Sequence, residues 1–193
     1  MTEPLSLLKA WLDEEQAKGA PNPRQAVLST CGNDAIPHAR VVAIREIEES
    51  GLLFFTQKGT KKVKEMLSNP HACITFWFEL FQREVILQGL IEPLSQDENK
   101  KYWESYSKEA KIRFYSYAET SSQPILHKDV LEDKKRQVED EYRNKALPLS
   151  PYYCGFRVKP STIMFYAYRT DELSDVFEYQ RVADAWQKQW LSP

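Results

Sequence analysis

The chain has 193 residues, of which 42% are hydrophobic and 28% are charged, as expected for one globular domain with a sizeable core. Its 26 lysines and arginines nearly balance 28 aspartates and glutamates, so the net charge of -2 argues against nucleic acid or an anionic membrane surface as the main partner. Three scattered cysteines, three scattered histidines and the absence of a long apolar run favour a cytoplasmic protein with no metal site and no membrane span.

In the first half of the chain, one amphipathic helix precedes a β-rich stretch. The helix is expected over Leu5–Lys18, because Leu7, Leu8 and Trp11 recur at helical spacing. A short helix is expected to start at Thr60, as a possible N-cap, and to end near Asn69-Pro70. Strands rich in β-branched and aromatic residues are expected at Ala26–Thr30, His38–Ile44, Leu52–Thr56, His71–Phe78 and Glu84–Ile91.

The second half adds helices before strands return. Ser95-Gln96-Asp97-Glu98 has the form of a capping box and predicts a helix that runs to about Ser107. A charged helix is expected over Asp129–Asn144, and strands from Tyr152 onward end in an aromatic-rich hairpin. Many short strands with inserted helices, and no alternation of strand and helix, predict one mainly β domain over residues 1–193, an antiparallel barrel with flanking helices.

Basic residues gather at two places that could bind an anion. Arg40 and Arg45 lie five apart on one predicted strand, so regular alternation places them on opposite faces unless a bulge intervenes. Gly59-Thr60-Lys61-Lys62, at the start of a helix, offers a turn, a hydroxyl, free backbone N–H groups and two cations. By itself a Lys-Lys pair is more often a solvated helix face, and a strand arginine is more often a partner in a surface ion pair.

In order along the chain, these segments resemble the pyridoxamine 5'-phosphate oxidase family. The resemblance extends from about Leu7 to the end. Its segments are Arg40-Val41-Val42-Ala43-Ile44-Arg45, Gly51–Thr56, Gly59–Lys62, Asn69-Pro70, Arg83-Glu84-Val85, Gly89, Lys101-Tyr102, Ser121-Ser122, Leu147–Val158, Tyr179-Gln180-Arg181, Trp186 and Leu191-Ser192-Pro193. It implies an FMN-binding split barrel, six-stranded and antiparallel, that forms a homodimer with FMN at the interface and uses a C-terminal hairpin in dimerisation.

The resemblance also implies which residues bind FMN. Arg40 matches an arginine at the flavin phosphate, where a guanidinium can bind bidentately, and Lys61 and Lys62 match an Arg-Lys pair there. Thr56 matches a hydroxyl near the phosphate or ribityl chain. The full set implied is Arg40, Val41, Val42, Phe55, Thr56, Thr60, Lys61, Lys62, Glu84, Ser121 and Tyr166, with Ser121 expected from the partner subunit. Glu84 stands where the family usually has glutamine, Tyr166 where it has tryptophan, and Val176 where it has arginine.

The implied substrate site departs further from the family. A clamp of Lys, Tyr, Arg and Ser for the substrate phosphate matches Arg45, Tyr102, Tyr106 and Ala110 here. The family's Arg-Leu-His over the substrate ring reads Glu172-Leu173-Ser174. An acid in place of a base should weaken the binding of an anionic substrate.

Three hypotheses follow from the resemblance. The first is an FMN-dependent oxidase of pyridoxamine or pyridoxine 5'-phosphate, in which a hydride passes from substrate C4' to flavin N5 and oxygen accepts the electrons; no side chain need be a nucleophile. The second is an FMN-dependent oxidoreductase of the same fold acting on another small molecule, favoured by Glu172, Ser174 and Ala110. The third is a non-catalytic flavin- or B6-binding protein.

Overall fold

A ring of six antiparallel strands forms the centre of the fold. The computed structural model describes residues 3–193, in which eight strands follow the order β3-β2-β1-β4-β5-β6-β7-β8. An additional pairing of β3 with β6 closes the first six strands into a barrel, and β7 and β8 continue from it as a hairpin. The predicted six-stranded antiparallel barrel with flanking helices is therefore confirmed.

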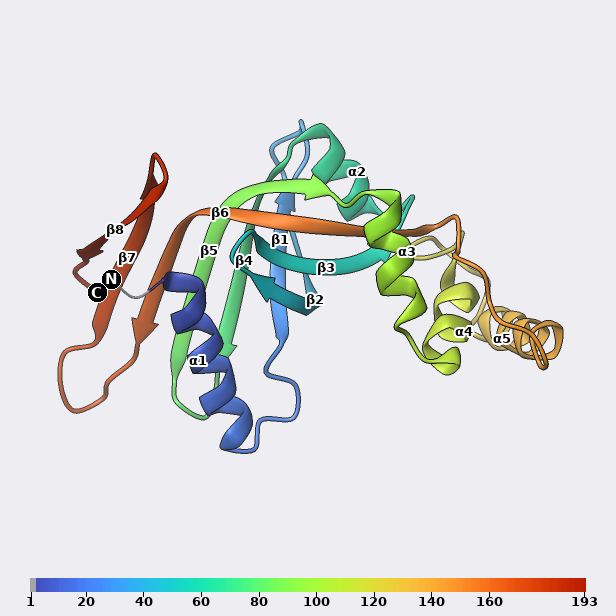
Figure 1. Ribbon diagram of the computed structural model, residues 1–193, viewed down its shortest axis with the longest axis horizontal. Coiled ribbons are helices and arrows are strands. Elements are labelled where there is room, and N and C mark those ends of the chain that lie inside the picture. The colour runs from blue at the N-terminus through green and yellow to red at the C-terminus, as the bar shows by residue number, and fades with distance from the viewer. Residues whose placement is uncertain (1–2) are drawn as a thin grey trace. The chain divides into compact units, whose positions relative to one another are not determined.

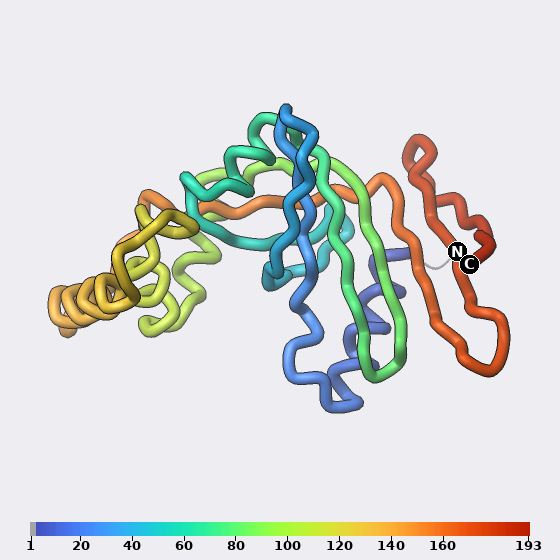
Figure 2. Tube along the Cα trace, turned by 180° about the vertical axis from the view of Figure 1, so that it is seen from behind, coloured from blue at the N-terminus to red at the C-terminus, as the bar shows by residue number. Residues whose placement is uncertain are grey.

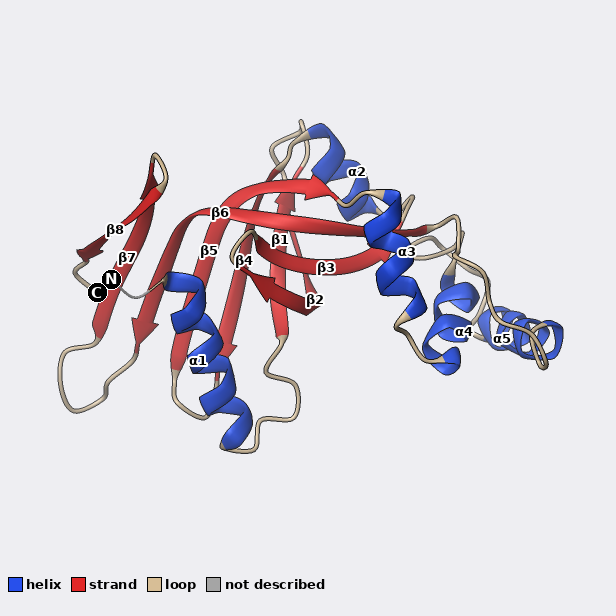
Figure 3. Ribbon diagram, in the orientation of Figure 1, coloured by secondary structure: helices blue, strands red, loops and turns tan. Residues whose placement is uncertain are grey.

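The strands and helices have the following bounds. The strands are β1 (Gln25–Cys31), β2 (Pro37–Glu48), β3 (Gly51–Gln57), β4 (His71–Phe78), β5 (Arg83–Pro93), β6 (Tyr153–Ala167), β7 (Asp175–Val182) and β8 (Ala185–Trp190). The helices are α1 (Pro4–Ala17), α2 (Lys61–Ser68), α3 (Gln96–Glu104), α4 (Lys108–Tyr117) and α5 (Asp129–Glu141). Figure 3 separates the two kinds of element by colour.

The chain divides into two compact units that interleave along the sequence. The first comprises the chain up to Phe54, Glu65–Glu92 and Phe156–Pro193, and the second comprises Phe55–Lys64 and Pro93–Gly155. The expectation that residues 1–193 act as one domain remains a prediction.

The core of the first unit is built where α1 packs on strands of the barrel (Figure 1). Trp11 of α1 meets Phe165 of β6 edge to face at 5.1 Å and Phe78 of β4 at 6.5 Å between ring centroids. Glu15 of the same helix is buried and accepts a hydrogen bond from the Leu80 amide after β4. Strands β1, β4 and β5 run side by side in this unit (Figure 2), and their register pairs Val27 with Thr75 and Thr75 with Ile86.

The second unit has a small aromatic core of its own. Trp103, Ile112, Val138, Leu147 and Tyr153 are buried together. The Trp103 indole N–H donates to the Leu147 carbonyl, so the polar atom of this buried ring is satisfied. Helices α3, α4 and α5 supply most of these side chains, and Tyr153 is the first residue of β6.

Most elements lie where the sequence places them, and the differences have local causes. The capping box at Ser95 and Glu98 is formed in both directions, but α3 ends at Glu104 and a separate helix, α4, starts after Ser107. Ser107 caps that second helix by accepting from the Ala110 amide, a signal that the sequence analysis passed over. The Thr60 carbonyl accepts the first hydrogen bonds of α2, from the Val63 and Lys64 amides. The Thr60 hydroxyl donates to the Gln57 carbonyl.

Two kinds of feature are absent from residues 3–193. No helix in this range is long and apolar enough to cross a membrane. No group of three or more histidine, cysteine, aspartate or glutamate side chains in the same range could hold a metal ion.

Candidate functional site

Arg40 lies in a buried polar cluster of the first unit. Its Nη1 donates to the Thr30 hydroxyl at 2.5 Å and to the Leu28 carbonyl at 3.3 Å, and its Nη2 lies 3.2 Å from Glu65 Oε2. Glu65 also accepts from the Thr30 hydroxyl at 2.6 Å and pairs with His38 Nδ1 at 2.8 Å. The Arg40 guanidinium is therefore held from one side by groups from β1 and α2.

The Glu65 carboxylate is the centre of this cluster. Burial alone would raise the pKa of Glu65, but the hydrogen bond from Thr30 and the charges of His38 and Arg40 outweigh it, and the net pKa is lowered. Glu65 therefore stays ionised and compensates the Arg40 charge. The bonds given above use three of the five N–H donors of Arg40, so Nε–H and one Nη2 proton can still form a bidentate fork toward an anion.

A second cation is held in the second unit. Lys62, in the first turn of α2, donates from Nζ to the Thr56 hydroxyl at 3.1 Å. Gly59 adopts a φ of +84° in the preceding turn, a conformation that glycine takes without strain, and Thr60 is buried behind it. Lys61 is exposed beside Lys62. The anion cradle predicted at Gly59–Lys62 lies at this turn, where Thr56 orients Lys62. Anion binding by the cradle, and its convergence with Arg40 on one phosphate, remain predictions.

Two predicted flavin contacts come together in the first unit. The Tyr168 hydroxyl donates a hydrogen bond to Glu84, and the Tyr168 ring stacks on Tyr166 with centroids 4.0 Å apart. Trp77, the register partner of Glu84, meets Tyr168 edge to face at 5.5 Å. Burial raises the pKa of Glu84 and outweighs the opposing hydrogen bond from Tyr168. The sequence analysis missed Tyr168 and Trp77; the available signal was a tryptophan on the more polar face of an alternating strand, where the structure leaves it half-exposed.

Other predicted flavin contacts lie on strand β2 and in a loop. Val42 is buried in β2, whereas Val41 is 61% exposed on the opposite face. Arg45 is exposed on the same side of β2 as Val41, which is the face opposite to Arg40. The regular alternation of β2 therefore holds as far as Arg45, where the pairing of β2 with β3 shifts in register. Ser121 is half-buried in the loop between α4 and α5.

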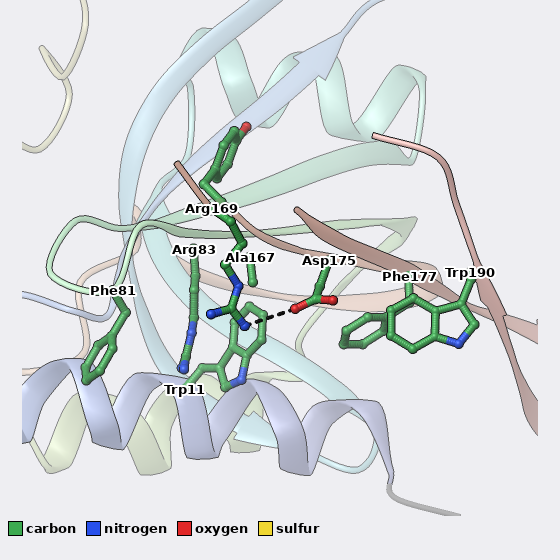
Figure 4. Close-up of a pocket in the computed structure, with 9 residues that line it drawn as sticks. Trp11, Phe81, Arg83, Ala167, Arg169, Asp175, Phe177 and Trp190 are labelled. Atoms are coloured by element: carbon green, nitrogen blue, oxygen red, sulfur yellow. Dashed lines mark hydrogen bonds and ion pairs between the residues drawn. The ribbon is translucent and has the colours of Figure 1, made fainter. Parts of the chain in front are cut away.

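The loop between β6 and β7 pairs its one cation, Arg169, with neighbouring acidic side chains. Arg169 lies 3.5 Å from Glu172 through Nη1 and 3.0 Å from Asp175 through Nη2, and its amide donates to the Ser174 hydroxyl. Glu172 and Ser174, the predicted substrate contacts, therefore both bind Arg169 within the loop, one by an ion pair and the other by a hydrogen bond. Arg169 also lines a cleft of about 330 Å³ whose rings include Trp11, Phe81, Phe177 and Trp190 (Figure 4).

The matched substrate-clamp positions of the second unit surround an aromatic pocket. Tyr106 and Ala110 line a pocket of about 120 Å³ together with Lys111 and the rings of Phe55, Trp103, Phe114 and Tyr153. Phe55 stacks on Tyr153 at 5.2 Å, and Tyr102 packs against Phe55 from outside the pocket at 4.9 Å. Lys111 Nζ donates to the Glu104 carbonyl at 3.3 Å. The structure thus brings Phe55, Tyr102 and Tyr106 together.

Comparison with known proteins identifies the class of the fold. Two family models match: "Pyridoxamine 5'-phosphate oxidase" over residues 12–142 and "Pyridoxine 5'-phosphate oxidase C-terminal dimerisation region" over residues 153–193. A Nostoc punctiforme protein described as pyridoxamine 5'-phosphate oxidase-related and FMN binding has the same fold, with a TM-score of 0.80 at 17% identity over the whole of both chains. The barrel is therefore a split barrel of the kind found in FMN-binding proteins.

Individual relatives narrow the assignment. Pyridoxine/pyridoxamine 5'-phosphate oxidases from Microcystis aeruginosa and Alteromonas mediterranea are 31% and 32% identical, covering 99% and 100% of this chain and 89% and 90% of theirs. The structure of PhzG from Burkholderia lata in complex with tetrahydrophenazine-1-carboxylic acid is 25% identical, has a TM-score of 0.91 and covers 100% of this chain and 94% of that one. The chain belongs to the pyridoxamine 5'-phosphate oxidase family. It is an oxidase-type enzyme of that family, for which FMN is the implied cofactor and a homodimer the implied assembly.

Proposed function

We propose that the protein is an FMN-dependent oxidase whose phosphate anchor is formed by Arg40 and Lys62. The observation that carries this proposal is that hydrogen bonds already orient both cationic side chains. Lys62 is oriented by Thr56, and Arg40 is fixed on one edge so that its other edge remains available to a phosphate. These groups fit a phosphomonoester, because a point charge and a planar fork supply complementary contacts to its oxygens.

FMN would supply the redox chemistry: it accepts a hydride equivalent from a substrate carbon and returns two electrons to dioxygen, giving hydrogen peroxide. The residues of this chain would bind and orient. Glu84 and Tyr166, joined through Tyr168, are proposed to contact the flavin, and Ser121 to contact the cofactor of the partner subunit. Val41, Val42, Phe55, Thr60 and Lys61 complete the proposed cofactor set.

We propose that the homodimer buries the open face of the barrel sheet. Val41, Val27, Thr75 and Ile86 form one row across β2, β1, β4 and β5 in register, and Val41 and Val27 are 61% and 38% exposed. Apolar side chains aligned on an outer sheet face are typical of an interface. The family's dimerisation region over residues 153–193 supports the same assembly, with β7 and β8 as its hairpin.

The substrate has two candidates. Pyridoxamine and pyridoxine 5'-phosphate come first, because relatives with 31% and 32% identity over nearly the whole chain carry that name. Oxidation of a different small molecule is the second candidate, and the aromatic surroundings of Tyr106 and Ala110 favour it. Oxygen consumption by the FMN-loaded protein with each B6 phosphate separates the two, because absence of turnover with both removes the first. We keep the cytoplasm as the proposed compartment, in keeping with three free cysteines.

The cofactor proposal is tested by titrating apoprotein with FMN and with riboflavin, which lacks the phosphate. Lys62→Met should weaken FMN binding by about 10- to 100-fold, the value of one charge-assisted hydrogen bond, and leave riboflavin binding unchanged. Lys64→Met is the matched control, because Lys64 is an exposed lysine on the same helix. Equal loss of FMN and riboflavin affinity in Lys62→Met would remove the phosphate assignment, and a protein that binds neither flavin would remove the proposed function.

A further inference from the structure

His38 belongs to the polar cluster around Arg40, but the proposed phosphate anchor does not include it. It lies two residues before Arg40 on β2, so both side chains are on the same face of the strand and both are half-buried. His38 Nδ1 lies 2.8 Å from Glu65 Oε1, whereas Arg40 and the Thr30 hydroxyl use Glu65 Oε2. One carboxylate is therefore shared between a permanent cation and a side chain of the type whose charge changes near neutral pH.

The contact with Glu65 decides which ring nitrogen of His38 carries hydrogen. The ionised Glu65 carboxylate only accepts hydrogen bonds, so a lone pair on Nδ1 would face a negative oxygen and be repelled. Nδ1 therefore holds the hydrogen of the neutral ring, and an added proton is taken at Nε2. Nδ1 is buried, whereas the His38 side chain as a whole is 27% exposed, so its other atoms reach solvent. Water can therefore supply the proton.

The charges around His38 come from its own strand and from α2. Strand β2 supplies Arg40 and α2 supplies Glu65, while β1 supplies the uncharged hydroxyl of Thr30, the register partner of His38. Other titratable groups of β1, the turn after it, β2 and α2 are placed as follows: Cys31 donates to the Gly32 carbonyl, Asp34 accepts from the Ile36 amide, Arg45 is exposed on the opposite face of β2, Lys62 donates to Thr56, and Lys61 and Lys64 are exposed. A proton on His38 is therefore influenced first by Glu65 and Arg40.

A phosphate bound to Arg40 would change the charge balance of this cluster. A phosphomonoester carries a charge of about -1.5 to -2 at pH 7. One edge of Arg40 is occupied by Thr30 and Glu65, so a phosphate on the other edge would leave two anions on either side of one guanidinium. Repulsion between the phosphate and Glu65 opposes binding, and a positive charge beside Glu65 reduces that repulsion. Histidine is the side chain that can gain such a charge near neutral pH.

We propose that His38 takes up a proton from water when the FMN phosphate binds to Arg40. His38 is then a positioning residue of the anchor: once protonated it compensates the Glu65 charge, and the charge of Arg40 is left to the phosphate. The proposal rests on the proposed function, since it concerns the same phosphate site. Binding of FMN and of the proton favour each other, so FMN should bind more tightly as the pH falls from 8 to 6. Because one proton is involved, the gain is at most about tenfold per pH unit.

Isothermal titration calorimetry of the full-length apoprotein with FMN counts the proton. Each titration is run at pH 7 in two phosphate-free buffers of different ionisation enthalpy, and the difference between the two binding enthalpies gives the number of protons taken up. We expect wild type to take up about half a proton or more for each FMN bound. Riboflavin, which lacks the phosphate, should bind without proton uptake. This comparison needs no variant.

Two substitutions assign the proton to His38. His38→Gln can still donate to Glu65 but cannot become charged, so proton uptake should disappear and FMN should bind about tenfold more weakly than to wild type at pH 6, with a smaller difference at pH 8. His38→Arg has a fixed charge, so it should bind FMN as wild type does at pH 6 and more tightly than wild type at pH 8, again without uptake. Comparison at equal pH cancels the titration of the phosphate itself. His127→Gln, at an exposed histidine paired with Asp129, is the matched control and should keep the wild-type uptake.

Three results would overturn the inference: no proton uptake by wild type with FMN, equal uptake with FMN and riboflavin, or uptake that persists in His38→Gln. In the last case the proton would be on Glu65 or on the phosphate. If His38→Gln does not fold, His38→Arg makes the same assignment, because uptake that persists in that variant also excludes His38. An apoprotein that binds no FMN counts against the proposed function, whereas FMN bound without proton uptake counts only against the role of His38.

Discussion

Removal of the Glu65 carboxylate tests whether Arg40 is held as the structure shows. Glu65→Ala deletes the acceptor shared by Thr30, His38 and Arg40. Glu65→Gln keeps a carbonyl oxygen for Thr30 and Arg40 and can turn its amide toward His38, so it removes the charge and largely preserves the geometry. The two variants therefore separate the contribution of the charge from that of the hydrogen bonds.

The expected magnitudes follow from burial. The Glu65 side chain is 7% exposed and that of Arg40 is 21% exposed, so the pair is less dry than a fully buried one. Breaking a fully buried pair costs about 3–5 kcal/mol, and access of water to Arg40 reduces the expected cost of Glu65→Ala to about 2–3 kcal/mol. In a chain of this length that cost lowers Tm by about 5–10 °C. Glu65→Gln should cost about 1 kcal/mol, because its hydrogen bonds remain.

The pH dependence has a definite sign. Since the pKa of Glu65 is lowered from its ordinary value of 4.5, its stabilising contribution is fully present above that value and is lost as the pH falls through the lowered pKa. The stability difference between wild type and Glu65→Gln should therefore be constant near neutral pH and shrink in acid.

The assay is urea unfolding of both Glu65 variants, of Arg40→Met and of the double variants, which closes a double-mutant cycle. A coupling energy between positions 40 and 65 below about 0.5 kcal/mol would refute the reasoning, because independent sites usually agree to that extent. A second readout concerns the cofactor: without the carboxylate, Arg40 has no counter-charge, so FMN should bind Glu65→Gln about tenfold more tightly than wild type, while riboflavin should not.

Three further predictions concern single residues. Burial raises the pKa of Cys154 to about 11, so its thiol should be alkylated at pH 8 at least tenfold more slowly in native than in unfolded protein, as measured by peptide mass spectrometry; equal rates would contradict the burial. Gly155→Ala should destabilise by about 1–3 kcal/mol in urea unfolding, because the new Cβ meets Phe55 at 2.4 Å, whereas Gly32→Ala, with its nearest atom at 3.4 Å, serves as control. Since the pKa of Glu84 is raised above its ordinary value of 4.5, its contribution to folding stability is lost as the pH rises from that value through the raised pKa, so Glu84→Gln should gain in Tm over wild type as the pH rises from 4 to 8; a gain independent of pH would exclude this cause.

The sequence predicted the barrel well because its strands carry local signals. The β-branched and aromatic residues of His71–Phe78 placed both ends of β4 correctly, and the Ser95–Glu98 capping box placed the start of α3. The end of α3 and the start of α4 were missed, since the break near Ser105 depends on a cap by Ser107 within an otherwise continuous polar stretch. The closing pair of β3 with β6 joins residues about 100 positions apart, and no local pattern reveals such a contact.

The candidate site was predicted less completely, because charge partners are set by tertiary contacts. Arg40 could be singled out from the sequence, but its bond to Glu65 joins β2 to α2 and has no spacing rule. Glu172 was interpreted as a loss of charge complementarity toward a substrate, whereas the structure shows its charge compensated by Arg169 three residues before it. The aromatic pocket depends on the stacking of Phe55 on Tyr153. These residues lie 98 positions apart in the sequence, so no local pattern predicts their contact.

The arrangement of β3 and β6 explains how such a chain could change its substrate and keep its cofactor. Successive residues of a strand point to opposite faces, so Phe55 belongs to the pocket and Thr56 to Lys62. Replacements at positions 106 and 110 change the pocket face, whereas Thr56 orients Lys62 from the other face of β3. Ala110→Leu should therefore leave the free energy of FMN binding within about 0.5 kcal/mol of wild type, and its effect on FMN binding should add to that of Lys62→Met in the double variant to the same extent. If Ala110→Leu instead weakened FMN binding as strongly as Lys62→Met does, the two faces would be energetically one site, and independent change at the substrate end would not be possible.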